Sequence, residues 1–284
     1  DNGPFAPLSV PEAPVLAEAR RHRYDALRMW KSRRKAECIA ALERFAPDEE
    51  RRPVWGRTES FVAAARDRAD PPWFVLAGRD DPRQKGYDVA AAAIEGILQK
   101  AGGGRTAQFL FFPIPGDEGR GGLAFLRRLA EAYPEDVVVL PFIFQEGYRS
   151  ALQGSAFGVM PSLYEPFGMA NEFYLNGAVG IGRATGGLLQ QIVPLRSVPS
   201  FTAGVASRSE RWHPPSAAPT GLLYREPDDL PDIVQDWRAF NAAGYLSRPD
   251  RDRLAERRSY RLFAALAAAL QRAIEDALAL SRPA

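Results

Sequence analysis

The chain of 284 residues has few of the side chains that most often carry redox or metal chemistry. Its one cysteine, Cys38, excludes a disulfide within the chain and fits a reducing compartment. Cys38 lies on an apolar face of a predicted helix, so we expect it to be a small buried hydrophobic residue. His22 and His213 are the only histidines, which are few for a histidine-based triad or metal cluster.

Long apolar runs and a dominant charge are also missing. No segment approaches the roughly 18 uninterrupted apolar residues of a transmembrane helix, and no signal-peptide pattern opens the chain. The 37 Lys and Arg residues nearly balance the 35 Asp and Glu residues, which leaves a net charge of +2. Such a weak field gives no reason to expect nucleic acid or a membrane as a partner. We expect a cytoplasmic globular protein.

Short apolar runs alternate with amphipathic or alanine-rich segments along the chain. Strands are predicted at 73–78, 107–113, 137–144, 158–160 and 179–183, with a further strand at 222–224. Helices are predicted at 88–99, 121–133, 148–153, 170–176 and 187–193, and a loop at 194–219. This alternation predicts an α/β fold, with a Rossmann-like parallel sheet that carries helices on both faces.

Further helices are predicted at both ends of the chain. One or two helices at 17–45 and another at 59–68 precede the first strand, and helices at 230–242 and 251–280 follow the last. We expect an arm with helices at 1–57, a Rossmann-like domain at 58–245 and a C-terminal helix at 246–284. Because Asp1 opens the chain in loop-like sequence, we expect a piece of a longer protein. The C-terminal helix then packs either on the domain or on a missing N-terminal domain.

Polar residues and glycines gather where predicted strands end, at the edge where parallel sheets bind ligands. After the first strand come Arg79 and Lys85, two cations suited to a diphosphate, with a solvated charged loop as the alternative. After the fourth come Glu165, an acceptor for sugar hydroxyls, and Gly168, which allows a close backbone approach. A carboxylate placed only to favour a helix N-terminus is the alternative for Glu165. A glycine turn at 185–187 follows the fifth strand, and together these segments predict a pocket for a sugar and a diphosphate.

Three segments, 79–88, 161–168 and 185–188, resemble the donor-binding motifs of glycogen and starch synthases. That family consists of retaining glucosyltransferases built from two Rossmann domains, the GT-B type. The spacing of Arg79 and Lys85 looks more like the animal and fungal enzymes, whereas the other two segments look more like the bacterial and plant enzymes. The resemblance extends over most of 73–193. It implies that this chain is the C-terminal, donor-binding half of such an enzyme.

Carried over position by position, the resemblance implies a role for each residue of these motifs. Arg79 and Lys85 would bind the nucleotide diphosphate and stabilise its departure, and Glu165 would contact the transferred glucose. The remaining donor contacts would come from Phe167, Gly168, Met169, Thr185, Gly186 and Gly187. Phe144 lies near the position of the family's base-stacking aromatic residue, with a core phenylalanine as the alternative. Cations and amides would stabilise the charge, so no metal ion and no cofactor is implied.

Three features depart from the family pattern. Glu172 follows Glu165 by one residue fewer than separates the paired glutamates of related enzymes, which makes Glu172 a second-tier donor-binding candidate. Phe167 stands where relatives tend to carry cysteine or tryptophan, and Ala170 where they tend to carry threonine. The missing hydroxyl at Ala170 would remove one phosphate contact, worth on the order of 1–3 kcal/mol.

The motifs predict a domain that binds ADP-glucose or UDP-glucose, for transfer of glucose to an α-1,4-glucan. We expect little or no transfer by this piece alone, because the N-terminal Rossmann domain would bind the glucan acceptor. One alternative is a non-catalytic nucleotide-sugar or glucan-binding module on the same scaffold. Another is a GT-B glucosyltransferase with a different acceptor. The expected partners are a nucleotide-glucose, an α-glucan and the N-terminal domain, without nucleic acid or membrane.

Overall fold

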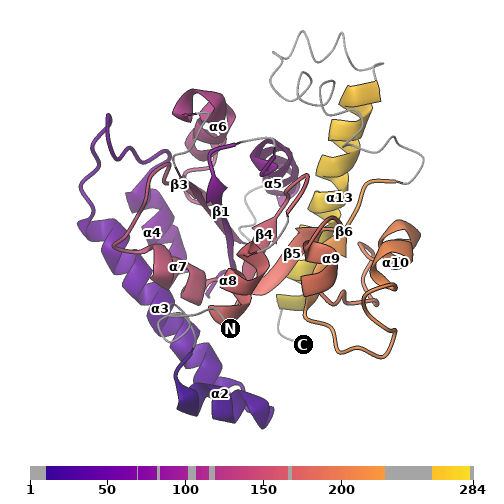
Figure 1. The fold of residues 1–284 in the computed structure, drawn as a ribbon. Coiled ribbons are helices and arrows are strands. Elements are labelled where there is room, and N and C mark those ends of the chain that lie inside the picture. The colour runs from indigo at the N-terminus through magenta and orange to yellow at the C-terminus, as the bar shows by residue number, and fades with distance from the viewer. Residues whose placement is uncertain are drawn as a thin grey trace. The chain divides into compact units, whose positions relative to one another are not determined.

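Figure 1 shows the fold of the chain, taken from a computed structural model. The structure describes residues 11–68, 70–81, 84–101, 107–114, 119–165, 168–227 and 258–281. The predicted helix at 230–242 lies outside these residues. Among the helices that are described, none is long and apolar enough to cross a membrane.

The strands form one six-stranded sheet in the order β3-β2-β1-β4-β5-β6. They are β1 (Trp73–Arg79), β2 (Gln108–Ile114), β3 (Val137–Val139), β4 (Phe157–Met160), β5 (Val179–Arg183) and β6 (Gly221–Tyr224). β1 pairs in parallel with β2 and β4, and β2 pairs in parallel with β3. This order is that of a doubly wound sheet, in which ligands bind at the carboxyl ends of the strands. The predicted α/β fold with a Rossmann-like parallel sheet is confirmed.

Helices connect the strands, and further helices lie at both ends of the chain as expected. Before β1 come α2 (Ala13–Arg20), α3 (Asp25–Arg44) and α4 (Thr58–Asp67). The connections hold α5 (Tyr87–Ala101), η2 (Arg120–Leu123), α6 (Ala124–Ala132), α7 (Tyr148–Gly154), α8 (Met169–Leu175), α9 (Leu188–Gln191) and α10 (Ala203–Ser209). After β6 comes α13 (Arg258–Ser281).

Two predicted segments differ from the structure. The strand expected at 137–144 ends at Val139. Leu140 still donates its amide to Phe111 O at 2.9 Å, but Pro141 has no amide hydrogen with which to continue the ladder. The loop expected at 194–219 contains α10, whose Val205 is fully buried. Burial of that side chain stabilises a short helix that the surrounding prolines and serines made hard to predict.

The chain packs as two compact units, each assembled from three stretches of sequence. The first unit holds Asp1–Asp80, Arg105–Val159 and Gly168–Gly180. The second unit holds Asp81–Gly104, Met160–Phe167 and Ile181–Ala284. The domain boundary predicted at 245 lies outside the described residues.

A buried glutamine organises the core of the first unit. Gln108, at the start of β2, has no exposed surface, and its side-chain oxygen accepts a hydrogen bond from Trp73 Nε1 at 2.8 Å. Its amide nitrogen donates to the carbonyls of Phe61 and Glu135, at 2.8 and 2.9 Å. Because all its hydrogen bonds are made, the polar group is tolerated in the core and ties α4 to β1 and β2.

α3 and α7 pack against each other in the first unit (Figure 1). Their closest approach is at Gly154, where a Cβ atom would lie 2.8 Å from the backbone nitrogen of Lys35. Lys31, one turn earlier on α3, donates to the carbonyls of Gln153 and Ser155 at 3.1 and 2.6 Å. Lysines near a helix C-terminus satisfy carbonyls that have no partner within the helix, so Lys31 caps the end of α7.

The buried Lys31 gives the protein a pH-dependent stability. Burial and the charge of Lys35 lower the pKa of the Lys31 ammonium to about 7, from 10.5 for an ordinary lysine. Between these two values the unfolded chain binds more protons than the folded chain, so the free energy of unfolding rises with pH. The rise is at most about 1.4 kcal/mol per pH unit. In Lys31→Met we expect the free energy of unfolding to rise less between pH 7 and pH 9, as measured by urea unfolding at each pH. An unchanged rise would mean that Lys31 does not cause this pH dependence.

Cys38 is fully buried on α3, as predicted from its apolar surroundings. Burial raises the pKa of its thiol to about 12, so almost no reactive thiolate is present at neutral pH. We expect a thiol-specific reagent to leave the folded protein unmodified and to add one label after denaturation, counted by mass spectrometry. Fast labelling of the folded protein would mean that α3 opens readily.

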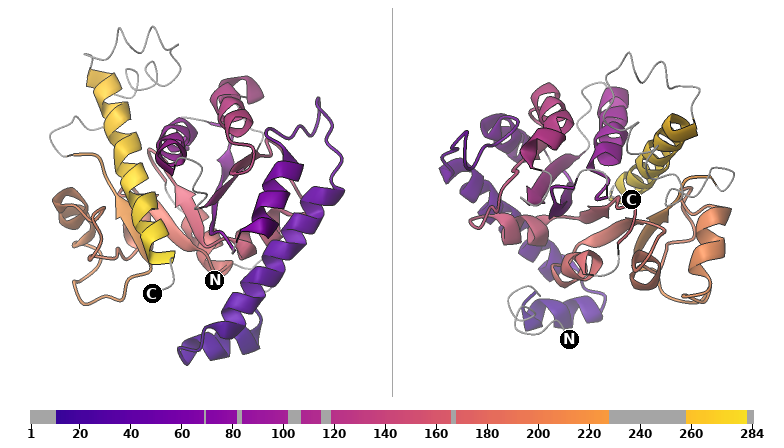
Figure 2. Two further views of the ribbon diagram at one scale, coloured as in Figure 1. Left: turned by 180° about the vertical axis from the view of Figure 1, so that it is seen from behind. Right: turned by 45° about the horizontal axis from the view of Figure 1, so that its top comes forward.

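The second unit is built around α13, which packs on α5 and β6 (Figure 2). Leu262, Leu266, Leu270 and Ile274 recur every four residues on this helix and are all buried. At the contact with α5, a Cβ atom on Gly96 would lie 2.7 Å from Gln271 Oε1, so glycine permits the close approach. The alanine-rich segment is thus a packed core helix.

Candidate functional site

Lys85 and Glu165 form an ion pair in the second unit. Lys85 lies in the turn that leads into α5, and Glu165 lies in the loop after β4. Lys85 Nζ is 2.7 Å from Glu165 Oε2, and the two side chains are only 14% and 6% exposed. Ser162, itself buried, donates its hydroxyl to the same oxygen at 3.1 Å. Two predicted site residues far apart in sequence are therefore brought together, with the carboxylate held by one charged and one neutral donor.

The turn around Lys85 is shaped by its neighbours. Asp81 caps the turn, because its side chain accepts the Gln84 amide at 2.9 Å and its carbonyl accepts the Lys85 amide at 3.1 Å. Gly86 has φ +69°, and a Cβ atom there would overlap the carbonyl oxygen of Pro161. Only glycine fits this backbone conformation and this close approach, which brings the turn against the loop after β4.

The predicted glycine turn meets the same loop from the other side. Gly187 donates its amide to Glu165 O at 2.7 Å, and Thr185 Oγ1 donates to Leu163 O at 3.3 Å. Gly186 has φ +47°, and a Cβ atom there would lie 2.6 Å from Glu165 O. In this structure these three residues hold the loop that carries Glu165.

Two residues that contribute to this site lie outside the predicted set of site residues. Arg183, at the end of β5, donates to Leu163 O at 2.8 Å and forms a buried ion pair with Glu226, which follows β6. A charged residue that ends an otherwise apolar strand was the available signal. Tyr164, next to Glu165, is 54% exposed, a high value for a large aromatic side chain beside a predicted pocket.

The other predicted site residues that the structure describes belong to the first unit. Arg79 is exposed at the end of β1, and Gly168, with φ +116°, precedes Met169 at the start of α8. α8 has only seven residues. Phe167 lies outside the described residues. Arg79, Gly168 and Met169 do not share a unit with the Lys85–Glu165 pair.

Glu172 is partly buried on α8 and accepts a hydrogen bond from Tyr148 Oη at 3.3 Å. Burial raises the pKa of the Glu172 carboxyl, although the Tyr148 hydrogen bond opposes the change. Burial and the nearby Glu172 charge raise the pKa of the Tyr148 phenol. Glu172 is therefore easier to protonate than an exposed glutamate, and it is oriented by a neutral tyrosine.

Phe144 lies in the aromatic core of the first unit. It is 1% exposed and packs in edge or stacked geometry with Phe45, Phe112 and Phe142, at ring-centroid distances of 5.5, 6.4 and 6.1 Å. Gly147 lies directly against the ring, and a Cβ atom there would overlap it. This environment is that of a core phenylalanine, the alternative to base stacking.

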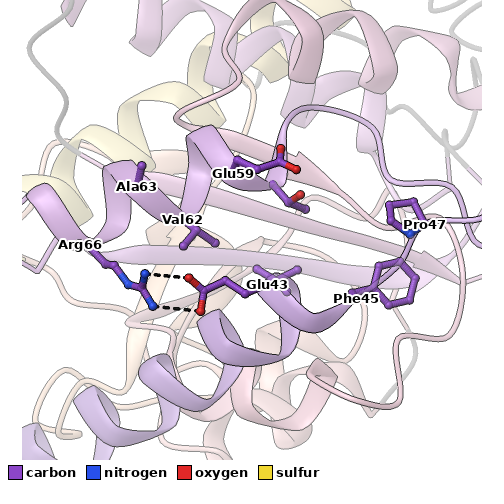
Figure 3. Close-up of a pocket in the computed structure, with 9 residues that line it drawn as sticks. Glu43, Phe45, Pro47, Glu59, Val62, Ala63 and Arg66 are labelled. Atoms are coloured by element: carbon purple, nitrogen blue, oxygen red, sulfur yellow. Dashed lines mark hydrogen bonds and ion pairs between the residues drawn. The ribbon is translucent and has the colours of Figure 1, made fainter.

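Figure 3 shows a pocket between α3 and α4 in the first unit, away from the predicted motifs in sequence. Its volume is about 270 Å³, and it is lined by Leu42, Glu43, Phe45, Pro47, Thr58, Glu59, Val62, Ala63 and Arg66. Glu43 and Arg66 form an exposed ion pair at its rim, 2.7 Å apart. None of the predicted site residues lines this pocket. Within the described residues, no group of three or more His, Cys, Asp or Glu side chains is placed to bind a metal ion.

Comparison with known proteins gives one family match and two related enzymes. Residues 39–172 match the model of a family described as family 4 glycosyltransferase in conflict systems. The glycogen synthase of Desulfatibacillum aliphaticivorans is 30% identical over 120 residues, which cover 40% of this chain and 22% of that protein. Glycogen synthase 1 of Geobacter sulfurreducens is 35% identical over 134 residues, which cover 43% and 23%.

Among solved structures, the catalytic domain of starch synthase IV from Arabidopsis thaliana, bound to ADP and acarbose, has a TM-score of 0.44. It is 13% identical, over 87% of this chain and 41% of that one. The chain spans less than a quarter of either glycogen synthase. The predicted resemblance is nevertheless confirmed: residues 39–172, which include Lys85 and Glu165, match that family 4 glycosyltransferase model, and segments of 120 and 134 residues are similar in sequence to glycogen synthases.

Proposed function

We propose that the chain is the donor-binding part of a retaining glucosyltransferase, which binds ADP-glucose or UDP-glucose and passes glucose to an α-1,4-glucan. The observation that carries the proposal is the pairing of Lys85 with Glu165 inside a loop held from both sides. A cation and a carboxylate fixed together match two adjacent parts of a nucleotide-sugar, the anionic diphosphate and the hydroxyl-bearing sugar.

In this proposal Lys85 and Glu165 exchange partners when the donor binds. The diphosphate carries more charge than one carboxylate and attracts the Lys85 ammonium away from Glu165. Glu165 stays bound to Ser162 and accepts hydrogen bonds from sugar hydroxyls in place of the amine. As the bond to the sugar breaks, negative charge grows on the leaving diphosphate, and Lys85 stabilises that charge more than it stabilises the ground state.

The acceptor would be bound by another domain of the whole enzyme, so we propose that this chain alone transfers little or no glucose. A non-catalytic nucleotide-sugar-binding module is the second candidate. Ala170, fully buried on α8, favours it, because this position has no hydroxyl for a phosphate. Glucose transfer to glycogen, measured after an N-terminal Rossmann domain is supplied, separates the two candidates.

The proposal predicts measurable binding of a nucleotide-glucose by this chain. Calorimetric titration with ADP, UDP, ADP-glucose and UDP-glucose is expected to give one site, with a clear preference for one base. The diphosphates should bind without their glucose, since Lys85 binds the phosphates, and adding glucose to the nucleotide should change the affinity through Glu165. Free glucose and AMP are the controls, because each lacks the diphosphate. Absence of binding by all four nucleotides would refute the proposed function.

A further inference from the structure

A buried ion pair lies behind the loop that carries Glu165. Arg183 and Glu226 are 1% and 3% exposed. Arg183 Nε donates to one carboxylate oxygen of Glu226 at 3.0 Å, and Nη2 donates to the other. Burial alone would raise the pKa of Glu226, but the Arg183 charge and its hydrogen bonds outweigh burial and hold that pKa below its usual value. Both groups are therefore charged in the folded protein.

The third nitrogen of the guanidinium has a different partner. Arg183 Nη1 donates to Leu163 O at 2.8 Å. Leu163 lies two residues before Glu165, in a loop without helix or strand structure, and is itself buried. The position of that loop depends on such contacts, because it has no internal ladder of hydrogen bonds.

A buried ion pair is a costly way to fill a core. Two charges lose their hydration, and well-packed apolar side chains in their place are often as stable or more so. A planar guanidinium can bind a carboxylate with two nitrogens while the third donates elsewhere, which neither an apolar side chain nor lysine can do. The feature that distinguishes Arg183 from a core leucine is thus its bond to Leu163 O.

We infer that Arg183, held in place by Glu226, is a positioning residue that fixes the loop at 161–165 and so orients Glu165 toward Lys85 and a bound donor. The inference about the loop rests on this geometry, and its consequence for the donor rests on the proposed function. Other bonds also hold the loop: Leu163 donates its amide to Gln84 O at 2.9 Å, Gly187 donates to Glu165 O at 2.7 Å, and Thr185 Oγ1 donates to Leu163 O at 3.3 Å. Without Arg183, the loop keeps these three bonds but loses the shorter, charged donor to Leu163 O.

The test uses a double variant, Arg183→Met with Glu226→Leu. An apolar pair of similar size removes both charges of the buried pair, and Arg225, which lies 3.7 Å from Glu226 Oε1, keeps its bond to Ala184 O at 3.1 Å. The fold is therefore expected to survive, with a thermal midpoint near that of the unchanged chain. The bond from Arg183 to Leu163 O is nevertheless gone, which leaves Thr185 Oγ1 as the donor to that oxygen. The matched control is Lys100→Met with Glu275→Leu, which removes an exposed ion pair of the same unit, 3.0 Å long.

Hydrogen exchange gives a readout that does not need a ligand. In the Arg183→Met, Glu226→Leu variant, the Leu163 and Gly187 amides are expected to exchange at least tenfold faster. The Ala184 amide, bonded to Tyr224 O at 2.8 Å, should stay protected, since it reports the contact between β5 and β6. Faster exchange confined to the loop supports the inference. Unchanged exchange at Leu163 and Gly187 in a folded variant overturns it.

Nucleotide affinity is the second readout, and it separates this inference from the proposed function. We expect the double variant to bind the preferred nucleotide-glucose at least tenfold more weakly, and the Lys100 control to bind it normally. If the unchanged chain binds no nucleotide, the proposed function fails, while the exchange result still decides the role of Arg183. If the double variant binds as well as the unchanged chain, Arg183 does not position Glu165.

Arg183→Lys covers the case in which the double variant does not fold. It keeps the charge opposite Glu226, but one ammonium cannot reproduce the three-nitrogen arrangement. We expect faster hydrogen exchange at the Leu163 amide and weaker nucleotide binding. The thermal midpoint should change little. A lysine variant with unchanged exchange and affinity would overturn the inference as well.

Discussion

Replacing Lys85 by alanine is expected to abolish nucleotide-sugar binding and to destabilise the second unit. Affinity should fall about a hundredfold or more, because the cation that balances the diphosphate is lost. The free energy of unfolding should fall by about 2 to 4 kcal/mol, since Glu165 would lose its charged partner in a nearly buried position and keep Ser162 as a donor. Calorimetric titration measures the first effect and urea unfolding the second.

Two control variants separate the loss of nucleotide binding from the loss of stability. Lys100→Ala removes a lysine of the same unit that is 68% exposed, and it should change stability by less than about 0.5 kcal/mol. Lys85→Met combined with Glu165→Gln removes both charges, so it should recover most of the lost stability while binding stays absent. Full affinity in Lys85→Ala would exclude Lys85 from the donor site.

Alanine at Gly86 is expected to prevent the loop after β4 from packing against the turn before α5. The backbone at Gly86 has φ +69°, and the added Cβ atom would overlap the carbonyl oxygen of Pro161. A backbone atom cannot move aside as a side chain can, so the strain and the overlap together should cost on the order of 3 kcal/mol or more. Urea unfolding gives the loss of stability, and the same sample should bind the nucleotide-glucose poorly.

The matched control for this substitution is Gly121→Ala. A Cβ atom at Gly121 would have no neighbour within 4 Å, and stability should change little. Gly186→Ala tests the opposite side of the loop, where the Cβ atom would lie 2.6 Å from Glu165 O at φ +47°. If Gly86→Ala unfolds at the same urea concentration as the unchanged chain, the close approach is not a feature of the folded protein.

The fold could be predicted because its strands are short apolar runs that end in glycine or a polar residue. The seven residues of β1 illustrate this, since all but Arg79 are buried. The end of β3 could not be read in the same way. Its apolar run continues to Phe144, but Pro141 within that run has no amide hydrogen to continue the ladder with β2. An apolar run predicts that a segment is buried. To form a strand, the segment must also exchange backbone hydrogen bonds with a neighbouring strand.

The site could be predicted in part. Lys85 and Glu165 lie beside glycines, directly after predicted strands. Parallel sheets bind ligands at these strand ends, so both residues could be predicted to lie at a site. The pair formed by Arg183 and Glu226 could not be found this way, because 43 positions separate two residues that look unrelated in sequence. Phe144 shows the opposite difficulty. An aromatic residue near a predicted pocket has the same sequence signal whether it faces a base or the core.

The second unit is assembled from three stretches of chain, and this bears on when the site can form. During synthesis, Gln84 and Lys85 emerge from the ribosome first, then the loop with Glu165, and Glu226 emerges last. A domain begins to fold from its N-terminal part during synthesis, but contacts between distant residues form late. A nascent chain that stops short of β6 would contain both Lys85 and Glu165 and still lack the support behind Leu163. Donor binding is therefore expected to appear only after release of a chain long enough to include Glu226.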